Sequence, residues 1–422
     1  MINIERSTGL RFALVLAVAP TLSIRLAAQT PPALPSPLSL TDVIRVASER
    51  RDEIQAARAR IRAGEARPII ASGLEDPMIS SSLDHLPFML GGADVSVTVE
   101  QRIPLSGIRS HRRASAVADL ERLRADANRT TLDVGVQAAN AFLMLQERRL
   151  TAVLVSEQIA FARDVVAAAN ARYASGTAPQ SDVLRAEVEV ARLEAFAKAL
   201  VSDVRGAEAM LNTSLARDAD TPVPPLAPVV FAQPLPSWPA IKAALTSRPE
   251  LAAGRAEVAR ADADVQVMRD MFRPMAIIRT GPAYTMAEGQ GWMAMVGLSV
   301  PIWRGKVRAG VAEAQAMRAM SEADLQAMTR MIEGDAAVAV HRLQAARDRQ
   351  AALTSDVLPR ARMVIEPAVT GYAAGRLPLV SVIEAVQALW LVQSDLIVAD
   401  TELGLAWARL GRAIGSYEEI IK

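Results

Sequence analysis

The chain has 422 residues, no cysteine and a formal net charge of +1, from 47 lysines and arginines and 46 aspartates and glutamates. Without cysteine it can form no disulfide, no thiolate metal site and no thiol nucleophile, and it offers no cysteine for N-terminal acylation. The balanced charge gives no overall support for binding to nucleic acid or to an acidic membrane surface. The three histidines, His85, His111 and His341, are far apart and form no ligand-like pair.

Residues 1–28 have the features of an export signal peptide. Arg6 and Arg11 give a basic start, an apolar run extends from Phe12 to Ala19, and Ala27 and Ala28 suit a cleavage site. The alternative is a cytoplasmic protein whose first helix is apolar. Residues 29–38 contain four prolines and predict an extended arm. Beyond this start no uninterrupted apolar run of about 18 residues occurs, so no transmembrane helix is expected.

Three short motifs recur at a nearly constant spacing, which is 197 residues from Arg51 to Arg248 and 199 from Tyr173 to Tyr372. The pairs are Arg51–Ile54 with Arg248–Leu251, Ile103–Pro104 with Val300–Pro301, and Tyr173–Pro179 with Tyr372–Pro378. A constant spacing of this size indicates a tandem duplication. We therefore expect a first repeat over 39–220, a proline-rich connector over 221–236, a second repeat over 237–415 and a tail over 416–422.

Each repeat shows the same order of predicted elements. A helix (about 39–72, then 237–271) precedes two strands (about 77–84 and 93–103, then 276–286 and 292–302). A long helix follows (about 106–171, then 305–370), and a glycine-proline tip (about 172–179, then 371–378) leads into a last helix. Pro282 lies within a predicted strand and is expected at a sheet edge or a bulge.

The segment 93–100 alternates strictly between apolar and polar residues. Val95, Val97 and Val99 face one side, and the polar residues between them face the other. This pattern suits a sheet with lipid on one face and water on the other, although a soluble, half-buried hairpin would show it too.

The long helices require helical neighbours. Sixty-six residues of helix, from 106 to 171, would extend about 100 Å at 1.5 Å per residue, too long for a globular domain to bury. The last helix of each repeat carries apolar residues at alternating spacings of three and four, which predicts coiled-coil packing. These residues are Val183, Val190, Leu193, Ala197, Leu200, Val204, Ala207 and Leu211, then Val382, Leu389, Val392, Leu396, Leu403, Ala406 and Leu410.

Four strands cannot close a membrane barrel, because closed barrels begin near eight strands. An open sheet edge in lipid leaves unpaired backbone groups, each of which costs several kcal/mol. The chain must therefore share a barrel with copies of itself. Two copies with eight strands and three copies with twelve both satisfy this requirement.

These motifs, in their repeated order, resemble the TolC family of outer-membrane efflux proteins over about residues 38–415. The tips carry the resemblance, together with Ser181–Ala186 and Ser381–Ala385, which follow them. The resemblance implies a mainly α protein with a small β part: duplicated long helical hairpins and four strands per chain. It also implies a homotrimer with a twelve-stranded barrel in the outer membrane and a helical tunnel in the periplasm. The expected partners are a periplasmic adaptor, an inner-membrane pump and outer-membrane lipid, with no nucleic acid and no cofactor.

Two segments bear on the substrate. Asp76–Met78, with Glu100–Pro104 and Gly107, resembles the outer-membrane components of heavy-metal pumps of the resistance-nodulation-division class. Methionines crowd the second strand pair, where they could bind copper or simply fill irregular apolar surface; they are Met268, Met271, Met275, Met286, Met293 and Met295. The predicted function is passive conduction of heavy-metal ions, and drug or protein (type I) export is the alternative.

Two other classes of protein fit the sequence less well. A periplasmic adaptor or coiled-coil scaffold also uses long helical hairpins, but an adaptor would have one hairpin inserted in β-rich domains. An enzyme is not expected, since the sequence shows no nucleophile–base set, no phosphate loop and no compact carboxylate pocket. Asp262 and Asp264 lie in an alanine-rich helix and are interpreted as a solvated face.

The resemblance also suggests two sites near the tips. The tips are expected to bind the adaptor through exposed Arg172 and Arg376, with Gly176 and Gly375 in a left-handed conformation that reverses the chain.

The gate of the tunnel is expected just past the second tip. Family members place acidic residues at positions that match Ser381 and Glu384, so one of the two acids is missing here. Glu384 would still give three carboxylates around a threefold axis, a ring that favours a bound divalent cation. Tyr372 and Asp182 match positions that link neighbouring coils in the closed state. The alternative is that Glu384 is solvated and Tyr372 is a packing aromatic.

Overall fold

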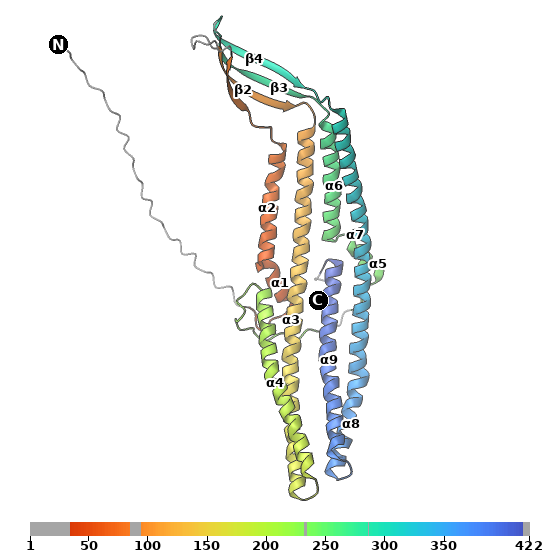
Figure 1. Ribbon diagram of the computed structural model, residues 1–422. Helices are drawn as coiled ribbons and strands as arrows, with labels where there is room; N and C mark the ends of the chain where they lie inside the picture. The colour runs from red at the N-terminus through yellow and green to blue at the C-terminus, as the bar shows by residue number, and fades with distance from the viewer. Residues whose placement is uncertain (1–33, 85–93, 232–233, 286, 417–422) are drawn as a thin grey trace, which may run out of the picture. The chain divides into compact units, whose positions relative to one another are not determined.

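Helices make up most of the chain, and a four-stranded sheet lies at one end of them (Figure 1). The computed structural model describes residues 34–84, 94–231, 234–285 and 287–416. The predicted signal peptide, half of the predicted arm and most of the predicted tail fall outside these residues. The prediction of a mainly α protein with a small β part is confirmed.

The first half of the chain contributes α1 (Leu40–Arg50), α2 (Asp52–Ser72), β1 (Met78–Asp84), β2 (Asp94–Pro104), α3 (Ile108–Ala174) and α4 (Gln180–Ser214). The second half contributes α5 (Trp238–Leu245), α6 (Pro249–Asp270), β3 (Met275–Thr285), β4 (Gly289–Ser299), α7 (Arg304–Ala352), a π-helical turn η1 (Leu353–Val357), α8 (Leu358–Ala373) and α9 (Leu379–Ile414). Both halves therefore run in the same order, and β4 begins and ends three residues before the predicted strand.

The first helix of each half is broken, so the prediction of single helices over 39–72 and 237–271 was wrong. Arg51 separates α1 from α2 with φ −60° and ψ 139°, and Arg248 caps α6 with φ −57° and ψ 134°. Both arginines are extended, and each binds the glutamate two residues later, Glu53 or Glu250. At Arg248 the following Pro249 disfavours helical dihedrals, and at both positions the arginine–glutamate pair forms beside the extended residue.

The sheet is antiparallel in the order β1-β2-β3-β4. Pro282 lies in β3, a central strand, and the β2–β3 register is the same on both sides of it, so its predicted place at a sheet edge or a bulge was wrong. The β2–β3 ladder instead lacks paired residues between Ser96↔Ala283 and Val99↔Thr280, beside Pro282. Proline has no amide hydrogen to donate there. The sheet accommodates it through this local gap.

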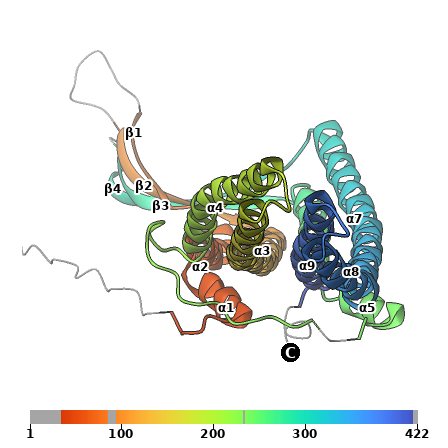
Figure 2. The same cartoon turned by 90° about the horizontal axis from the view of Figure 1, so that it is seen from below.

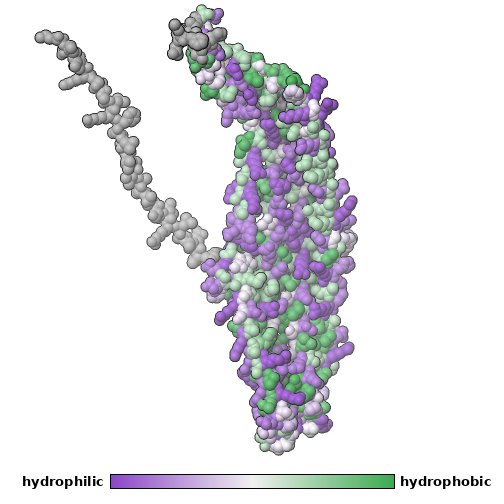
Figure 3. All heavy atoms as spheres, in the orientation of Figure 1, coloured by the Kyte–Doolittle hydropathy of each residue, from purple (hydrophilic) through white to green (hydrophobic). Residues whose placement is uncertain are grey.

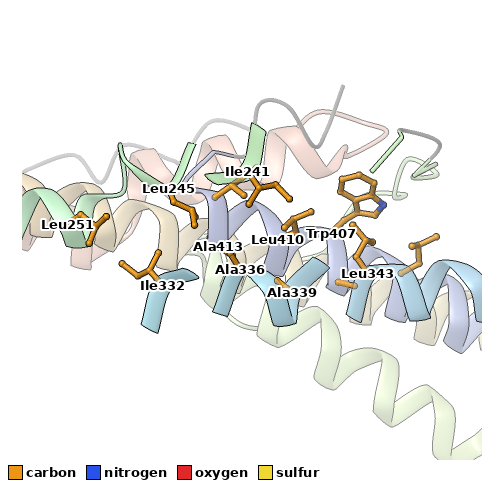
Figure 4. Packing of buried hydrophobic residues seen from close by; sticks show 13 residues of the cluster. Ile241, Leu245, Leu251, Ile332, Ala336, Ala339, Leu343, Trp407, Leu410 and Ala413 are labelled. Atoms are coloured by element: carbon orange, nitrogen blue, oxygen red, sulfur yellow. The ribbon is translucent and has the colours of Figure 1, made fainter. Parts of the chain in front are cut away.

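The two hairpins lie side by side, α3 with α4 and α8 with α9 (Figure 2). Above them α3 packs on α6, and α6 on α7. Short α5 covers α7 and α9, where it completes an apolar cluster in which Ile241, Leu343 and Leu410 are at most 2% exposed (Figure 4). The connector packs against the start of the chain, because Leu38 accepts from the Ala227 amide at 2.8 Å and donates to the Pro225 carbonyl at 2.9 Å.

By length and composition alone, α9 would suffice to cross a membrane. The expectation that no transmembrane helix follows the N-terminus stays a prediction, because length and composition alone do not decide it. It relied on an uninterrupted run, and Glu384 and Asp395 interrupt this one. The helix packs along α7, α3 and α8. Four positions of its predicted seam are buried: Val382, Leu403, Ala406 and Leu410. Its apolar character is that of a helix in a bundle.

A buried ionic network joins the end of α9 to the start of α6. Arg248, whose side chain is 7% exposed, donates to the Ala413 carbonyl and to Glu250 at 2.7 Å. Arg412 also binds Glu250 at 2.7 Å, and it binds Asp133 of α3 at 2.6 Å. We call Arg248, Glu250, Arg412 and Asp133 the joint network. The network gives the Ala413 carbonyl at the end of α9 a hydrogen-bond donor, and it links α3, α6 and α9 at one point.

The joint network predicts an acid-sensitive contribution to stability. Burial of Glu250 disfavours its charged form, but hydrogen bonds from Arg248, from its own backbone and from Arg412 outweigh burial and lower its pKa from 4.5 to about 2. A lowered carboxyl pKa stabilises the fold above pH 4.5, and this stabilisation is lost as the pH falls towards 2. Glu250→Gln should therefore cost about 2–3 kcal/mol of unfolding free energy at pH 7 and almost nothing near pH 2. Chemical unfolding of both proteins across this range measures the difference, and a cost that does not change with pH would contradict the assignment.

Candidate functional site

Each hairpin tip reverses the chain at a glycine with positive φ. Gly176 has φ 73° and Gly375 has φ 72°, which confirms the predicted left-handed conformation. The amide of Thr177 donates to the Arg172 carbonyl at 2.9 Å, and the amide of Arg376 donates to the Gly371 carbonyl at 2.8 Å. These bonds close the ends of α3 and α8. A proline then precedes α4 and α9, where its fixed φ suits the start of a helix.

Arg172 ties the two tips together. Its guanidinium lies 4.4 Å from the centroid of the Tyr372 ring, and it donates to the Tyr372 carbonyl and, at 3.2 Å, to the Thr177 carbonyl. The Arg172 side chain was predicted to be exposed, and that prediction was wrong, because the side chain is half-buried between the hairpins. Arg376 is exposed, as expected.

Tyr372 is 6% exposed and packs in an apolar cluster built from both hairpins, with Ala169, Val183 and Val382. Among the described residues its hydroxyl has no hydrogen-bond partner. Burial raises the pKa of this hydroxyl, and the nearby Asp182 carboxylate raises it further. The fold thus brings Tyr372, Asp182 and Arg172 together within one chain, and we call these three residues the tip cluster.

Glu384 and Ser381 lie in the first two turns of α9. Glu384 is exposed and Ser381 is half-buried, whereas Val382 and Val386 pack into the apolar cluster beside them. Because Glu384 lies between the two buried valines in sequence, it faces away from that cluster. Its carboxylate is therefore free to face another molecule.

The sheet exposes its apolar face, and the polar side chains of β2 are buried on its other face. Ile79, Leu83, Val95, Val97, Val99, Ile278, Tyr284, Trp292, Val296 and Leu298 share one face and are each at least 42% exposed. Ser96, Thr98 and Glu100 of the other face are at most 8% exposed. Green patches over the sheet mark part of this apolar surface (Figure 3). A soluble hairpin would bury the valines, so the soluble alternative does not fit.

Polar contacts cross the covered face of the sheet. Ser80 lies 3.1 Å from Thr98 and Ser82 lies 2.7 Å from Ser96, oxygen to oxygen. Arg279 of β3 donates to Glu100 of β2 at 3.0 Å. Met293 and Met295 share this face by register, and among the described residues no group of three histidine, aspartate or glutamate side chains could hold a metal ion. Met286 lies outside the described residues.

A charged groove runs along the upper helices. It has a volume of about 950 Å³ and is lined by α2, α3, α6 and α7. Arg122 of α3 binds Asp119 at 2.6 Å and Asp126 at 3.0 Å, and Arg260 of α6 binds Asp264 at 3.1 Å. Because paired charges of both signs line this groove, its surface is hydrophilic.

Long helical hairpins that end in a sheet with its apolar face outward define a class of membrane channel rather than a soluble scaffold. Residues 240–416 match the family model described as outer membrane efflux protein. The chain is 24% identical to the outer membrane efflux protein BepC of Brucella suis, and the alignment covers 89% of this chain and 85% of BepC. It is also 24% identical to the pyoverdine export outer membrane protein OpmQ of Pseudomonas putida, with 90% and 85% covered.

A third relative is the cobalt-zinc-cadmium resistance protein CzcC of Cupriavidus metallidurans, which is 28% identical over 69% of this chain and 71% of CzcC. Two solved structures share the fold. The outer-membrane channel OprN has a TM-score of 0.78 at 18% identity, with 90% of both chains covered. CusC has a TM-score of 0.79 at 14% identity, with 90% of this chain and 92% of CusC covered.

Residues 240–416 thus match the outer membrane efflux protein family, and the similarity to its named members extends over most of the chain. The chain is located in the outer membrane, and its helical hairpins extend into the periplasm. The fold is that of efflux channels, not of enzymes.

Sequence reasoning missed three groups of contacts. It treated Arg172 as a docking residue, did not pair Glu100 with Arg279, and did not find the joint network. The repeated arginine at Arg51 and Arg248, each two residues before a glutamate, was visible as a repeat marker. Its position at a helix start was the signal for a structural role.

Proposed function

We propose that the chain is the outer-membrane duct of a tripartite efflux system, a homotrimer in which three four-stranded sheets close one twelve-stranded barrel. The observation that carries this proposal is the sheet with its apolar face exposed. Lipid would cover Val95, Val97 and Val99, and water would contact the face of Glu100 and Arg279. Strands β1 and β4 are the sheet edges and would pair with those of neighbouring copies.

Conductance across a planar bilayer tests the channel. The purified protein should form pores of defined conductance. Val97→Arg would place a charge on the lipid face, at a cost of about 2–4 kcal/mol per chain, and should reduce insertion sharply. Met295→Arg, a substitution at an exposed position on the opposite face, is the matched control. Equal insertion of both variants would argue against lipid contact at Val97.

The hairpin tips are the proposed docking surface for a periplasmic adaptor that connects the duct to an inner-membrane pump. Arg376 is the better residue for testing docking, because its side chain is exposed, whereas Arg172 also holds the tips together. Arg376→Glu should weaken adaptor binding by about 1 kcal/mol, or roughly fivefold in the dissociation constant. Lys198→Glu makes the same charge change on the exposed surface of α4, away from the tip. Unchanged binding by Arg376→Glu, with normal assembly, would remove Arg376 from the docking surface.

The tip cluster and Glu384 are the proposed gate. A cation–π contact worth about 1 kcal/mol biases a closed–open equilibrium about fivefold. Arg172→Ala, which removes this contact, should therefore raise single-channel conductance or open time. Tyr372→Phe combined with Asp182→Ala keeps the contact and tests the expected link to a neighbouring copy, since the Tyr372 hydroxyl has no partner in the described part of this chain; it should raise conductance as well. Glu384→Ala should weaken block by divalent cations, and Ser381→Ala should leave the block unchanged. If conductance and block are the same in every well-assembled variant, Tyr372 is a packing aromatic and Glu384 a solvated residue.

The proposed substrate is a heavy-metal ion, and the resemblance to CzcC supports it. The likeness to a pyoverdine exporter supports the alternative, export of larger organic molecules. Deletion of the gene should lower the concentrations of cobalt, zinc or cadmium that stop growth. Unchanged metal tolerance together with new drug sensitivity, or with loss of a secreted product, would favour the alternative.

A further inference from the structure

Positive charge is concentrated where the helices meet the sheet, at the upper ends of α3, α6 and α7 in Figure 1. Residues 101–118, 271–285 and 299–312 connect these helices with the strands, and together they contain nine lysines and arginines and no aspartate or glutamate. The whole chain has a net charge of only +1. The junction between helices and sheet therefore carries a local excess of positive charge.

The acids beside these segments neutralise little of that charge. Glu100 is 4% exposed and binds Arg279 on the polar face of the sheet. Asp270 is 7% exposed and lies 2.8 Å from His111. The acidic residues 75–76, before β1, are exposed. The excess of positive charge is thus open to a partner outside the chain.

Four exposed arginines of the junction have no acidic partner in the part of the chain that the structure describes. Further from the sheet the arginines are paired, as Arg122 is with Asp119 at 2.6 Å and Arg260 with Asp264 at 3.1 Å. We call the four unpaired residues the basic collar. They are Arg113 of α3, Arg269 of α6, and Arg304 and Arg308 of α7.

The basic collar lies on the face of the helices opposite to the charged groove. Asp262 of α6 and Glu322 of α7 bind the same arginine of α7, and neither of them lines the groove. Residues seven apart share a helix face. Arg269 lies seven residues after Asp262, and Arg308 lies fourteen residues before Glu322, with Arg304 one turn further on the same side. These three arginines therefore share the face that is turned away from the groove.

Arg113 has the corresponding position on α3. It lies eleven residues, about three turns, before Arg124. Arg124 lies 3.7 Å from Glu65 of α2, and neither residue lines the groove. All four arginines of the basic collar are thus on one side of the molecule, although they come from three helices.

Apolar side chains lie directly beside the basic collar. Val300 is 58% exposed, Ile302 is 70% exposed and Trp303 is 75% exposed. Val300 and Ile302 continue the alternation of Leu298, which belongs to the exposed apolar face of β4. Because Arg304 follows at once, the apolar surface of the sheet passes into the basic collar without a gap.

We propose that the basic collar binds the phosphate groups of anionic phospholipids in the periplasmic leaflet of the outer membrane. Arginine matches phosphate oxygens with its planar fork of N–H donors. Each cation near an anionic membrane surface contributes about a fivefold attraction. Trp303 would lie at the level of the headgroups, where tryptophan is enriched in membrane proteins. The inference rests on the proposed function, in which lipid surrounds the sheet, and adds a preference for one class of lipid.

Native mass spectrometry of the protein extracted from vesicles with equal amounts of phosphatidylglycerol and phosphatidylcholine measures this preference. The assembled wild-type protein should retain at least about tenfold more phosphatidylglycerol. Replacing the four arginines of the basic collar by glutamine keeps good helix formers in place and should bring the ratio close to one. Equal retention of the two lipids by the wild-type protein would overturn the proposal, whether or not the variant assembles.

A control variant removes the same number of charges from exposed positions of α4 and α8 that also have no acidic partner among the described residues. It combines Arg185→Gln, Lys198→Gln, Arg205→Gln and Arg362→Gln. This variant should keep the wild-type ratio, and loss of the preference here would show that overall charge, not the basic collar, selects the lipid.

Two further measurements separate lipid from free anion and the basic collar from the duct. Millimolar inorganic phosphate should not displace the retained phosphatidylglycerol, and complete displacement would show a simple anion site in place of a lipid site. The wild-type protein should also form pores in phosphatidylcholine alone. Absence of these pores would contradict the proposed function, whereas a lipid ratio of one contradicts only the role of the basic collar.

Discussion

Replacing Gly281 by alanine should abolish the assembled protein in the outer membrane. A Cβ atom at this position would lie 2.9 Å from the Cα of Thr98 and still closer to the carbonyl of Val97 in the neighbouring strand. Both partners are backbone atoms, so neither can yield without separating β2 from β3. Each backbone group then left unpaired in lipid costs several kcal/mol. We therefore expect at least a tenfold loss of folded protein, measured in isolated outer membranes by resistance to protease and to unfolding in detergent.

Gly291→Ala is the matched control. Gly291 belongs to the same sheet, but its Cβ would meet nothing nearer than the Ala283 carbonyl at 4.0 Å. This variant should assemble at the wild-type level. Normal assembly of Gly281→Ala would contradict the close approach of β2 and β3, and with it the sheet register on which the lipid-facing surface depends.

The second large effect is expected at Arg248. Its removal would leave Glu250 buried with one fewer partner and the Ala413 carbonyl without its donor. Breaking a buried pair by removing one partner costs about 3–5 kcal/mol. Arg248→Ala should therefore lower the free energy of unfolding by about that amount in each chain, measured by chemical unfolding in detergent.

Arg51 provides a control at the corresponding position of the first half. It binds Glu53 in the same way, but its side chain is 16% exposed, the Glu53 side chain is 51% exposed, and its other partner is Gln137. Arg51→Ala should cost about 1 kcal/mol or less. Equal costs for the two variants would show that burial of the joint network contributes no additional stability.

The sequence allowed prediction of those features that depend on local chemistry. Glycine and proline at the tips determine where each hairpin reverses, and the alternation of Val95, Val97 and Val99 identified the exposed apolar side of β2. The spacing of the motifs predicted the repeated order of elements. Apart from this spacing, each of these signals is contained in a few neighbouring residues.

Features that depend on distant contacts could not be predicted in this way. Arginine is no helix breaker by itself, and Arg51 ends α1 where its side chain binds Glu53 and the distant Gln137. Arg248 differs, because Pro249 follows it and disfavours helical dihedrals at the residue before it. Arg172 is a basic residue near an exposed turn, and only the meeting of two tips 200 residues apart places it over the Tyr372 ring. The single helix predicted over 305–370 is interrupted at η1, so that prediction was wrong. Pro359 can be read from the sequence, but its effect on the hydrogen bonds of the helix around it depends on how the neighbouring turn relaxes.

The mass of the purified mature chain in mild detergent tests the central claim most directly. Four strands with two free edges and an exposed apolar face require copies of the chain to close a barrel. We expect a stable assembly of three chains that needs detergent to stay in solution. A dimer would replace the twelve-stranded barrel with one of eight strands, and a monomer stable without detergent would contradict the shared barrel altogether.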